Sequence, residues 1–335
     1  MLIIEHDDEF EYLRHIDGDV FLIDENAYKH FKSHFDSYKI IKIPSGEESK
    51  SMSNLEPIIK KLLKFNLRRN QMIVGVGGGV VTDIAAFLAS VYKRGTKLGL
   101  VPTTLLAQVD ASIGGKSGVN FHNLKNLIGT FKTPEYIYVN RYFLNTLPRE
   151  ELKNGMAEVI KYGLIYDEKL FNWLIENDLK SILKDETLLE KIISRSANIK
   201  NEIVAHDPFD VGFRKILNFG HTLGHAIELL YNISHGQAVS IGMSFGMEFS
   251  HLKGDISSDE LMSFYKIVNA YNMQYKYDFA VDEVAKIVSQ DKKASYDKIE
   301  FILLKAIGEP YIFNTDIIEF KSVCHEVLKL WKERP

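Results

Sequence analysis

Two histidines four residues apart, His221 and His225, could bind one metal ion. If this stretch is helical, both imidazoles project from one face, a spacing that helices use to hold a metal. A third histidine, His235, follows at an expected turn before the next helix. Structural zinc sites usually add cysteines, and this chain has only Cys324. Histidine with carboxylate or water would leave an open, catalytic position, whereas the simpler interpretation is a polar helix with two surface histidines.

Three consecutive glycines at 77–79 follow a run that predicts a buried strand at 71–76, and a helix is expected from Ile84. A glycine turn of this kind lets backbone N–H groups approach a phosphate, and the helix N-terminus favours its charge. The dinucleotide fingerprint GxGxxG does not fit, because Val80 stands where a glycine is required. A pyrophosphate site and an ordinary tight turn both stay open.

An acidic segment at 45–50 comes directly after a strand expected at 38–43. In nucleotide-binding α/β units, a carboxylate just beyond the second strand is well placed to bind ribose hydroxyls. Taken by itself, the segment has a simpler interpretation as an acidic surface loop. Ribose binding is therefore one of two hypotheses for this segment.

A long polar run at 102–129 follows the strand expected at 98–101. It interleaves apolar residues with Thr, Gln, Asp, Ser, Lys and Gly. Loops this polar on a rigid sheet commonly carry function. Lys116, Lys125 and Asn126 could bind substrate oxyanions, although either lysine alone is more simply interpreted as a solvated surface residue.

The elements that must position these residues change in kind near Pro148. From 1 to 147, strands alternate with helices, which predicts an α/β domain with a mostly parallel sheet and helices on both faces. From 148 to 335, long helical periods dominate, and the best strand candidate is 299–304. The other strands are expected at 20–23, 38–43, 71–76, 98–101 and 136–139, with a helix over 51–65.

Composition excludes several classes of protein. The chain has 335 residues, 45% hydrophobic and 26% charged, which suggests two soluble domains. A net charge of -4 argues against nucleic acid and membrane surfaces as partners, so an anionic substrate would need a local cluster of cations. One cysteine fits a reducing cytoplasm. The acidic start predicts no signal peptide, and no apolar run approaches the roughly 18 residues of a membrane span.

Five segments together resemble the 3-dehydroquinate synthase family, part of the sugar phosphate cyclases. They occur in the family's order, and the match runs from Gly46 to Gly308. The polar run and the double-histidine stretch are specific in combination. The resemblance implies an N-terminal Rossmann-like NAD-binding domain and a mainly α-helical metal- and substrate-binding domain. The segments are residues 77–79, 102–116, 154–163, 217–228 and 235–236.

The resemblance implies two cofactors. One is a divalent metal, usually zinc and alternatively cobalt, held by Glu158, His221 and His235. In this interpretation His225 is not a ligand and is similar to the family's proton-transfer histidine. The other cofactor is NAD, lying along the glycine turn. The implied NAD contacts are Glu47, Lys50, Gly78, Gly79, Asp83, Thr103, Thr104, Asp110, Lys116 and Lys125.

The implied substrate is DAHP, 3-deoxy-D-arabino-heptulosonate 7-phosphate, whose carboxylate and phosphate call for several cations. The implied substrate contacts are Asp110, Lys116, Lys125, Asn126, Lys161, Lys200, Arg214, Asn218, His225, Lys292 and Lys293. The implied catalytic residues are His225, Lys161, Asn126, Lys116 and Arg94.

The resemblance also implies a homodimer in which Arg94 reaches the partner subunit's site. The helix expected from Ile84 is apolar on most sides, so we expect a second subunit to bury part of it. The alternative is that Arg94 forms a local salt bridge at the end of this helix, where a cation is favourable.

The implied activity is a cytoplasmic lyase of the shikimate pathway, which leads to chorismate and the aromatic amino acids. NAD-mediated transient oxidation, phosphate elimination, reduction, ring opening and an intramolecular aldol step would convert DAHP to 3-dehydroquinate. A cyclase for a neutral sugar phosphate would not need Lys200, Arg214 and Asn218. A metal-dependent polyol dehydrogenase would consume NAD, and a non-catalytic NAD-binding protein would not need the metal and proton-transfer residues.

Four positions depart from the family pattern. Thr82 stands where glycine is frequent, next to the glycine turn. The acidic run before Arg214 contains Pro208 and the shorter Asp210, and Gln237 replaces a frequent glutamate after His235. We expect these changes to affect the local geometry of the site rather than its chemistry.

Overall fold

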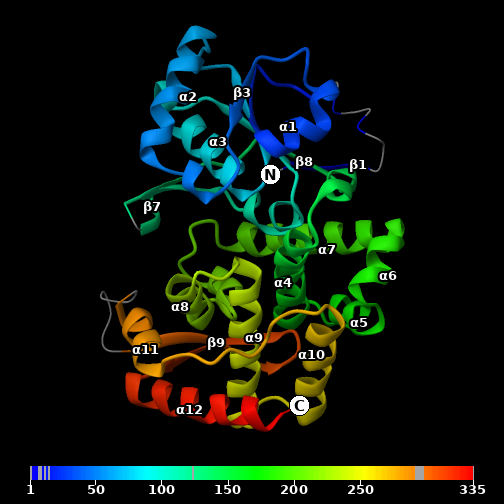
Figure 1. Cartoon of the computed structure of the whole chain (residues 1–335), viewed down its shortest axis with the longest axis vertical. Coiled ribbons are helices and arrows are strands. Elements are labelled where there is room, and N and C mark those ends of the chain that lie inside the picture. Colours follow the sequence, from blue (N-terminus) through cyan, green and yellow to red (C-terminus); the bar gives the residue numbers. More distant parts are fainter. Residues whose placement is uncertain are drawn as a thin grey trace. The chain divides into compact units, whose positions relative to one another are not determined.

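The computed structural model describes residues 2–6, 10, 13, 16–122, 124–290 and 298–334. The chain divides into two compact units, residues 1–155 with 196–201, and residues 156–195 with 202–335. The first unit is α/β and the second is mainly helical (Figure 1). Among the described residues, no helix combines the length and apolar character needed to cross a membrane.

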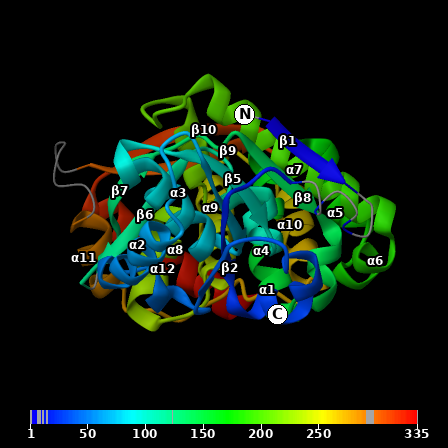
Figure 2. The ribbon, with the colours of Figure 1, turned by 90° about the horizontal axis from the view of Figure 1, so that it is seen from above.

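The α/β unit is built on one six-stranded sheet in which every pair of neighbours is parallel. Its order is β1-β8-β5-β4-β2-β3. Figure 2 shows this unit from above, with β1, β8, β5 and β2 of the sheet labelled. The five predicted strands all form, and β1 adds a sixth at the edge. The strands are β1 (Leu2–His6), β2 (Val20–Asp24), β3 (Ile40–Ile43), β4 (Met72–Gly77), β5 (Lys97–Pro102) and β8 (Tyr136–Asn140).

The central strands are apolar along their whole length because the parallel sheet buries them on both faces. All of β4 is buried, as are the first four residues of β2. The predicted α/β fold class is therefore confirmed. Three α-helices belong to this part of the chain: α1 (Glu25–Phe31), α2 (Met52–Lys64) and α3 (Gly79–Val91).

Helix α3 begins at Gly79, not at Ile84 as predicted, so the glycine turn is itself the helix N-terminus. Seven apolar residues of α3 are buried within this single chain, Val80 is partly buried, and Val91 is 47% exposed. The apolar character of α3 therefore does not require a second subunit, contrary to our expectation. Packing against β4, β5 and β6 accounts for it.

The polar run does not form one loop. It forms a π-helical turn at Ala107–Ala111 and then an antiparallel hairpin of β6 (Lys116–Phe121) and β7 (Leu124–Phe131). Most of β7 is exposed, and hydrogen bonds of its backbone to β6 hold it in place. Its sequence therefore lacks the alternation of apolar and polar residues that would predict a strand. Short 3-10 turns occur at Lys32–His34, Glu47–Ser49, Tyr92–Arg94, Arg141–Thr146 and Phe213–Asn218.

The second unit is mainly helical, as predicted, and the strand expected at 299–304 is part of β9. β9 pairs with β10, which the sequence pattern had not indicated. Helix α9 contacts both α8 and α10 and lies between them in Figure 1. The elements are α4 (Arg149–Ile165), α5 (Glu168–Glu176), α6 (Leu179–Lys184), α7 (Glu186–His206), α8 (His221–Tyr231), α9 (His235–Leu252), α10 (Ser258–Ala270), α11 (Val281–Gln290), β9 (Ile299–Ala306), β10 (Glu309–Thr315) and α12 (Ile317–Glu333).

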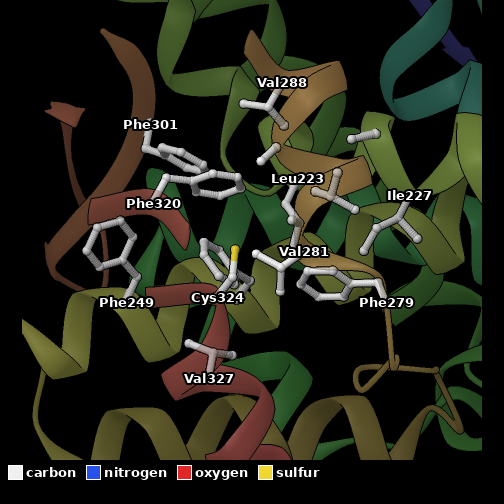
Figure 3. Packing of buried hydrophobic residues seen from close by; sticks show 14 of the residues in the cluster. Leu223, Ile227, Phe249, Phe279, Val281, Val288, Phe301, Phe320, Cys324 and Val327 are labelled. Carbon is white, nitrogen blue, oxygen red and sulfur yellow. The ribbon is translucent and has the colours of Figure 1, made fainter. Parts of the chain in front are cut away.

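One apolar cluster orients helix α8. Leu223 and Ile227 point into the same cluster as Phe279 and Val281, and Phe320 and Cys324 of α12 extend it (Figure 3). Because residues four apart share a helix face, burying this face leaves His221 and His225 on another. The hydrophobic core thereby decides which way the histidine face of α8 turns.

Helices α8 and α9 approach closely through glycines. A Cβ on Gly242 of α9 would collide with the carbonyl oxygen of Gly220, and one on Gly224 would lie 2.8 Å from the carbonyl oxygen of Ala238. Gly220 also has φ 78°, a conformation that favours glycine. The small residues therefore set the distance between the two histidine-bearing helices.

We expect Gly242→Ala to lower the free energy of unfolding by about 1–3 kcal/mol, because overpacking forces backbone shifts. The same substitution should also weaken metal binding by moving His221 away from His235. Thermal melting and zinc titration measure the two effects. Gly79→Ala is a control for melting alone, since its Cβ would meet only the Ala111 methyl at 3.4 Å. Unchanged melting of the Gly242 variant would contradict the prediction.

Candidate metal and nucleotide sites

Glu158, His221 and His235 converge in the helical unit. One ligand atom from each lies within 4.8 Å of the others. The Nε2 atoms of His221 and His235 are 3.4 Å and 3.5 Å from the same carboxylate oxygen, Oε1 of Glu158. The structure thus brings together the three residues that the family resemblance implied as ligands.

Each of the three comes from a different helix. Glu158 lies in the third turn of α4, His221 begins α8 after the left-handed Gly220, and His235 begins α9. Ser234 caps α9 in a capping box with Gln237, whose side chain accepts from the Ser234 backbone at 3.1 Å. Gln237 therefore replaces the family's glutamate without losing the cap, since either residue closes such a box.

The surroundings of Glu158 fit a cation. Its carboxylate is fully buried, and neither oxygen accepts a hydrogen bond of good geometry from the residues that the structure describes. Lys161, one helical turn along α4, forms a buried ion pair with Oε2. A buried carboxylate with few hydrogen bonds, facing two imidazole nitrogens, matches the donor set of catalytic zinc sites.

The protonation states at this site follow from burial and from charged neighbours. Burial alone would raise the pKa of Glu158, but Lys161 and the two histidines hold it well below its usual range. Burial and Lys161 lower the pKa of His221. Burial would also lower the pKa of His235, yet contacts with Glu158 and Glu228 raise it to about 9. The site therefore holds a carboxylate anion that can bind a metal. A metal ion would compete with protons for the nitrogen atoms of the two histidines.

Contacts behind the two histidines orient their rings. His221 Nδ1 is 3.0 Å from the carbonyl oxygen of Phe219, and His235 Nδ1 is 3.1 Å from Oε2 of Glu228. Sequence reasoning assigned no role to Glu228. Its position seven residues after His221, two helical turns along the same face, was the available signal.

His225 lies outside this group of three. Its ring centroid is 5.0 Å from that of His221 and 6.3 Å from that of His235. The side chain is exposed, unlike the ligand candidates. An exposed imidazole at the edge of a metal site suits proton transfer better than coordination.

In the α/β unit, several of the implied NAD residues lie at or beside the start of α3. Gly78 is the N-cap and Gly79 the first helical residue, so their N–H groups belong to the unpaired donors of the helix. Thr82 Oγ1 donates to the carbonyl oxygen of Gly79 at 3.0 Å, so this larger residue is tied to the backbone of the turn. Thr103 N donates to Gly77 O at 2.9 Å, which holds the next strand end beside the turn.

An ion pair joins this turn to the 45–50 segment. Lys50, itself buried, contacts Asp83 of α3. Burial raises the pKa of Asp83, with Lys50 opposing the shift. Glu47 accepts a 2.8 Å hydrogen bond from Asn120 of β6, so the hairpin fixes this segment.

The same unit holds six further implied residues. Lys200 of α7 is buried and pairs with Asp110 at 2.8 Å. Lys116, Lys125 and Asn126 are exposed on the β6–β7 hairpin, and the Asn126 backbone has φ 54°. Thr104 Oγ1 accepts from Ala107 N at 3.1 Å, which starts the π-helical turn.

Arg214 and Asn218 lie on the short turn before α8. Asp207 accepts backbone hydrogen bonds from Val211, Gly212 and Arg214, so it organises this segment, while Asp210 takes the left-handed φ of 59°. Arg214 is buried and donates to Pro208 O at 3.1 Å, and Asn218 is exposed. Lys292 and Lys293 lie outside the described residues.

Arg94 ends the 3-10 turn after α3 with φ 65°, directly after Lys93 at φ 49°. Its side chain is exposed, and it makes no ion pair within the described part of the chain. The expected alternative, a local salt bridge at this helix end, is therefore not formed there.

Two solved structures share the fold of this chain. A 2-epi-5-epi-valiolone synthase from Streptomyces hygroscopicus, with NAD+ and Zn2+ bound, matches with TM-score 0.89 at 22% identity over 98% of this chain and 96% of that chain. A 2-deoxy-scyllo-inosose synthase, complexed with carbaglucose-6-phosphate, NAD+ and Co2+, matches with TM-score 0.84 at 24% identity over 97% and 96%. At these identities the likeness concerns the fold.

Comparison with related sequences identifies the family of this chain. Family models for the 3-dehydroquinate synthase N-terminal and C-terminal parts match residues 40–154 and 155–294. The 3-dehydroquinate synthase of Saccharolobus solfataricus is 45% identical over 86% of this chain and 84% of its own length. That of Pyrococcus abyssi is 44% identical over 80% and 79%. The chain belongs to the 3-dehydroquinate synthase family.

We expect His221→Ala to leave a folded protein that has lost stoichiometric zinc, because two remaining ligands hold a metal poorly. Zinc content after dialysis and circular dichroism measure the two properties. His325→Ala, which removes an exposed histidine from α12, should keep the metal. Full zinc occupancy in the His221 variant would show that the metal is held elsewhere.

Proposed function

We propose that this protein is a 3-dehydroquinate synthase, which converts DAHP to 3-dehydroquinate and inorganic phosphate in the shikimate pathway. It is then a carbon–oxygen lyase without net oxidation. One observation carries the proposal: Glu158, His221 and His235 converge in a chain that belongs to this family. The single cysteine supports the reducing cytoplasm as its location.

The two proposed cofactors have matching residues in separate units. Glu158, His221 and His235 would hold a divalent metal, most often zinc. The start of α3, with Lys50 and Asp83, would hold NAD. When bound, NAD supplies reversible hydride acceptance and the metal supplies Lewis acidity toward substrate oxygens.

The remaining residues bind the substrate and move protons. His225 would accept or donate a proton at a substrate hydroxyl, which its exposure on α8 supports. Lys161 would bind a substrate oxygen beside Glu158. Fixing one substrate conformer supplies much of the rate when several steps follow one another.

DAHP carries a carboxylate and a phosphate, and each unit has cations for oxyanions. The α/β unit contributes Lys116, Lys125 and Lys200, with Asp110 and Asn126 beside them. The helical unit contributes Lys161 and Arg214, with Asn218 as a neutral donor. The guanidinium of Arg214 suits a bidentate contact with a carboxylate. This set supports DAHP over a neutral sugar phosphate.

We expect purified enzyme with zinc and a small amount of NAD to release one phosphate for each DAHP, without accumulating NADH. Phosphate assay, NADH absorbance and product identification by NMR measure this outcome. Enzyme treated with a chelator is the control and should be inactive. NADH formed in step with product would instead indicate a polyol dehydrogenase. Turnover of a sugar phosphate that lacks a carboxylate, but not of DAHP, would indicate another cyclase.

We also propose a homodimer whose sites share Arg94 across the interface. Arg94 is exposed, and the β6–β7 hairpin of the same unit supports an interface because it exposes large apolar residues. These are Phe121, Leu124, Leu127 and Phe131. Exposed apolar groups of this kind commonly mark contact surfaces.

Mixing two inactive variants, Arg94→Ala and His225→Ala, should restore activity if Arg94 acts in the partner's site. Hybrid dimers then contain up to one intact site, so the mixture should recover up to about a quarter of wild-type activity at random exchange. Phosphate release after verified subunit exchange is the measurement. The matched control mixes His225→Ala with Lys161→Ala, because these two residues would act in the site of one and the same subunit. No recovery in the first mixture would contradict the shared site.

A further inference from the structure

We propose that Glu228 is a positioning residue for the metal ligand His235. The inference rests on the proposed metal site and extends it beyond the three ligands. Oε2 of Glu228 lies 3.1 Å from Nδ1 of His235, while Nε2 on the other side of the ring faces Glu158. One imidazole is therefore held between two carboxylates, of which only Glu158 is in the ligand group.

The two histidines differ in what lies behind them. His221 has a neutral partner, the backbone carbonyl of Phe219 at 3.0 Å. His235 has a side-chain carboxylate, and the side chain of Glu228 is 15% exposed, so water screens this contact little. A substitution of Glu228 can remove the carboxylate behind His235. The backbone carbonyl behind His221 remains whatever side chain stands at position 219.

The local fold holds Glu228 and His235 at this distance. Glu228 lies in the last turn of α8, and its carbonyl accepts from Asn232 N at 3.1 Å. Asn232 takes the left-handed conformation that ends α8, and the capping box of Ser234 with Gln237 starts α9. Only three residues separate the two helices, so their ends bring the carboxylate and the imidazole together.

The chemical consequence is a fixed tautomer. When Nδ1 donates a hydrogen bond to Glu228, Nε2 carries no proton and would be free to bind a metal. The carboxylate also makes the imidazole a stronger donor, as in carboxylate–histidine–zinc arrangements. Losing such a partner typically weakens metal binding about 10–100-fold.

The experiment compares zinc dissociation constants by competition with a chelator in full-length protein. Glu228→Ala should weaken zinc binding about 10–100-fold, and Glu228→Gln, which keeps an acceptor without charge, should fall between Ala and wild type. Glu326→Gln makes the same charge change at an exposed site of α12 and should leave the constant unchanged. The visible spectrum of the Co2+ form should shift in the Glu228 variants alone, because a purely structural role would not alter the ligand field.

Zinc binding by Glu228→Ala and Glu228→Gln within twofold of wild type would overturn the inference. If the alanine variant does not fold, Glu228→Gln and its Co2+ spectrum decide the matter. The measurement is independent of turnover. A wild-type enzyme that releases phosphate from DAHP while its Glu228 variants bind zinc normally refutes the role of Glu228 alone. If the wild-type protein binds zinc but does not act on DAHP, while the Glu228 variants bind zinc more weakly, only the proposed function is refuted.

Discussion

The close contact between helices α8 and α9 is the constraint on which the metal site depends. Gly220 and Gly242 lie where any side chain would collide with the facing backbone. This contact brings the first residues of the two helices, His221 and His235, to one carboxylate oxygen of Glu158. The apolar cluster behind α8 then fixes the rotation of that helix, so packing decides both the spacing and the direction of the ligands.

Buried charges come in compensated groups, and this is how a chain of net charge -4 can hold cations for an anionic substrate. Glu158 contacts Lys161 and two histidines, Lys50 contacts Asp83, and Lys200 contacts Asp110. An unpaired buried charge would be strongly unfavourable, whereas a paired one leaves its polar atoms held in place. Each unit therefore carries preformed ionic groups that its own packing orients.

Helices and strands with a clear pattern of apolar residues were predictable from the sequence. Elements that depend on backbone pairing alone, or that begin at a glycine, were not. Strands such as β4 are buried on both faces, and their apolar runs indicate this directly. The β6–β7 hairpin lacks any such pattern because β7 is mostly exposed. The start of α3 at Gly79 was missed for a related reason, since glycine has low helix propensity although its N–H groups are useful there.

The sequence by itself determined which chemistry is available: imidazoles at helical spacing, a glycine turn after a buried strand, and cations in specific motifs. These depend on residue type and local spacing, which a sequence contains. The tertiary structure decided that Glu158 meets two histidines more than 60 residues away, and that Glu228 stands behind His235. Such contacts depend on how helices pack and rotate, and that packing is a property of the whole core rather than of any one segment.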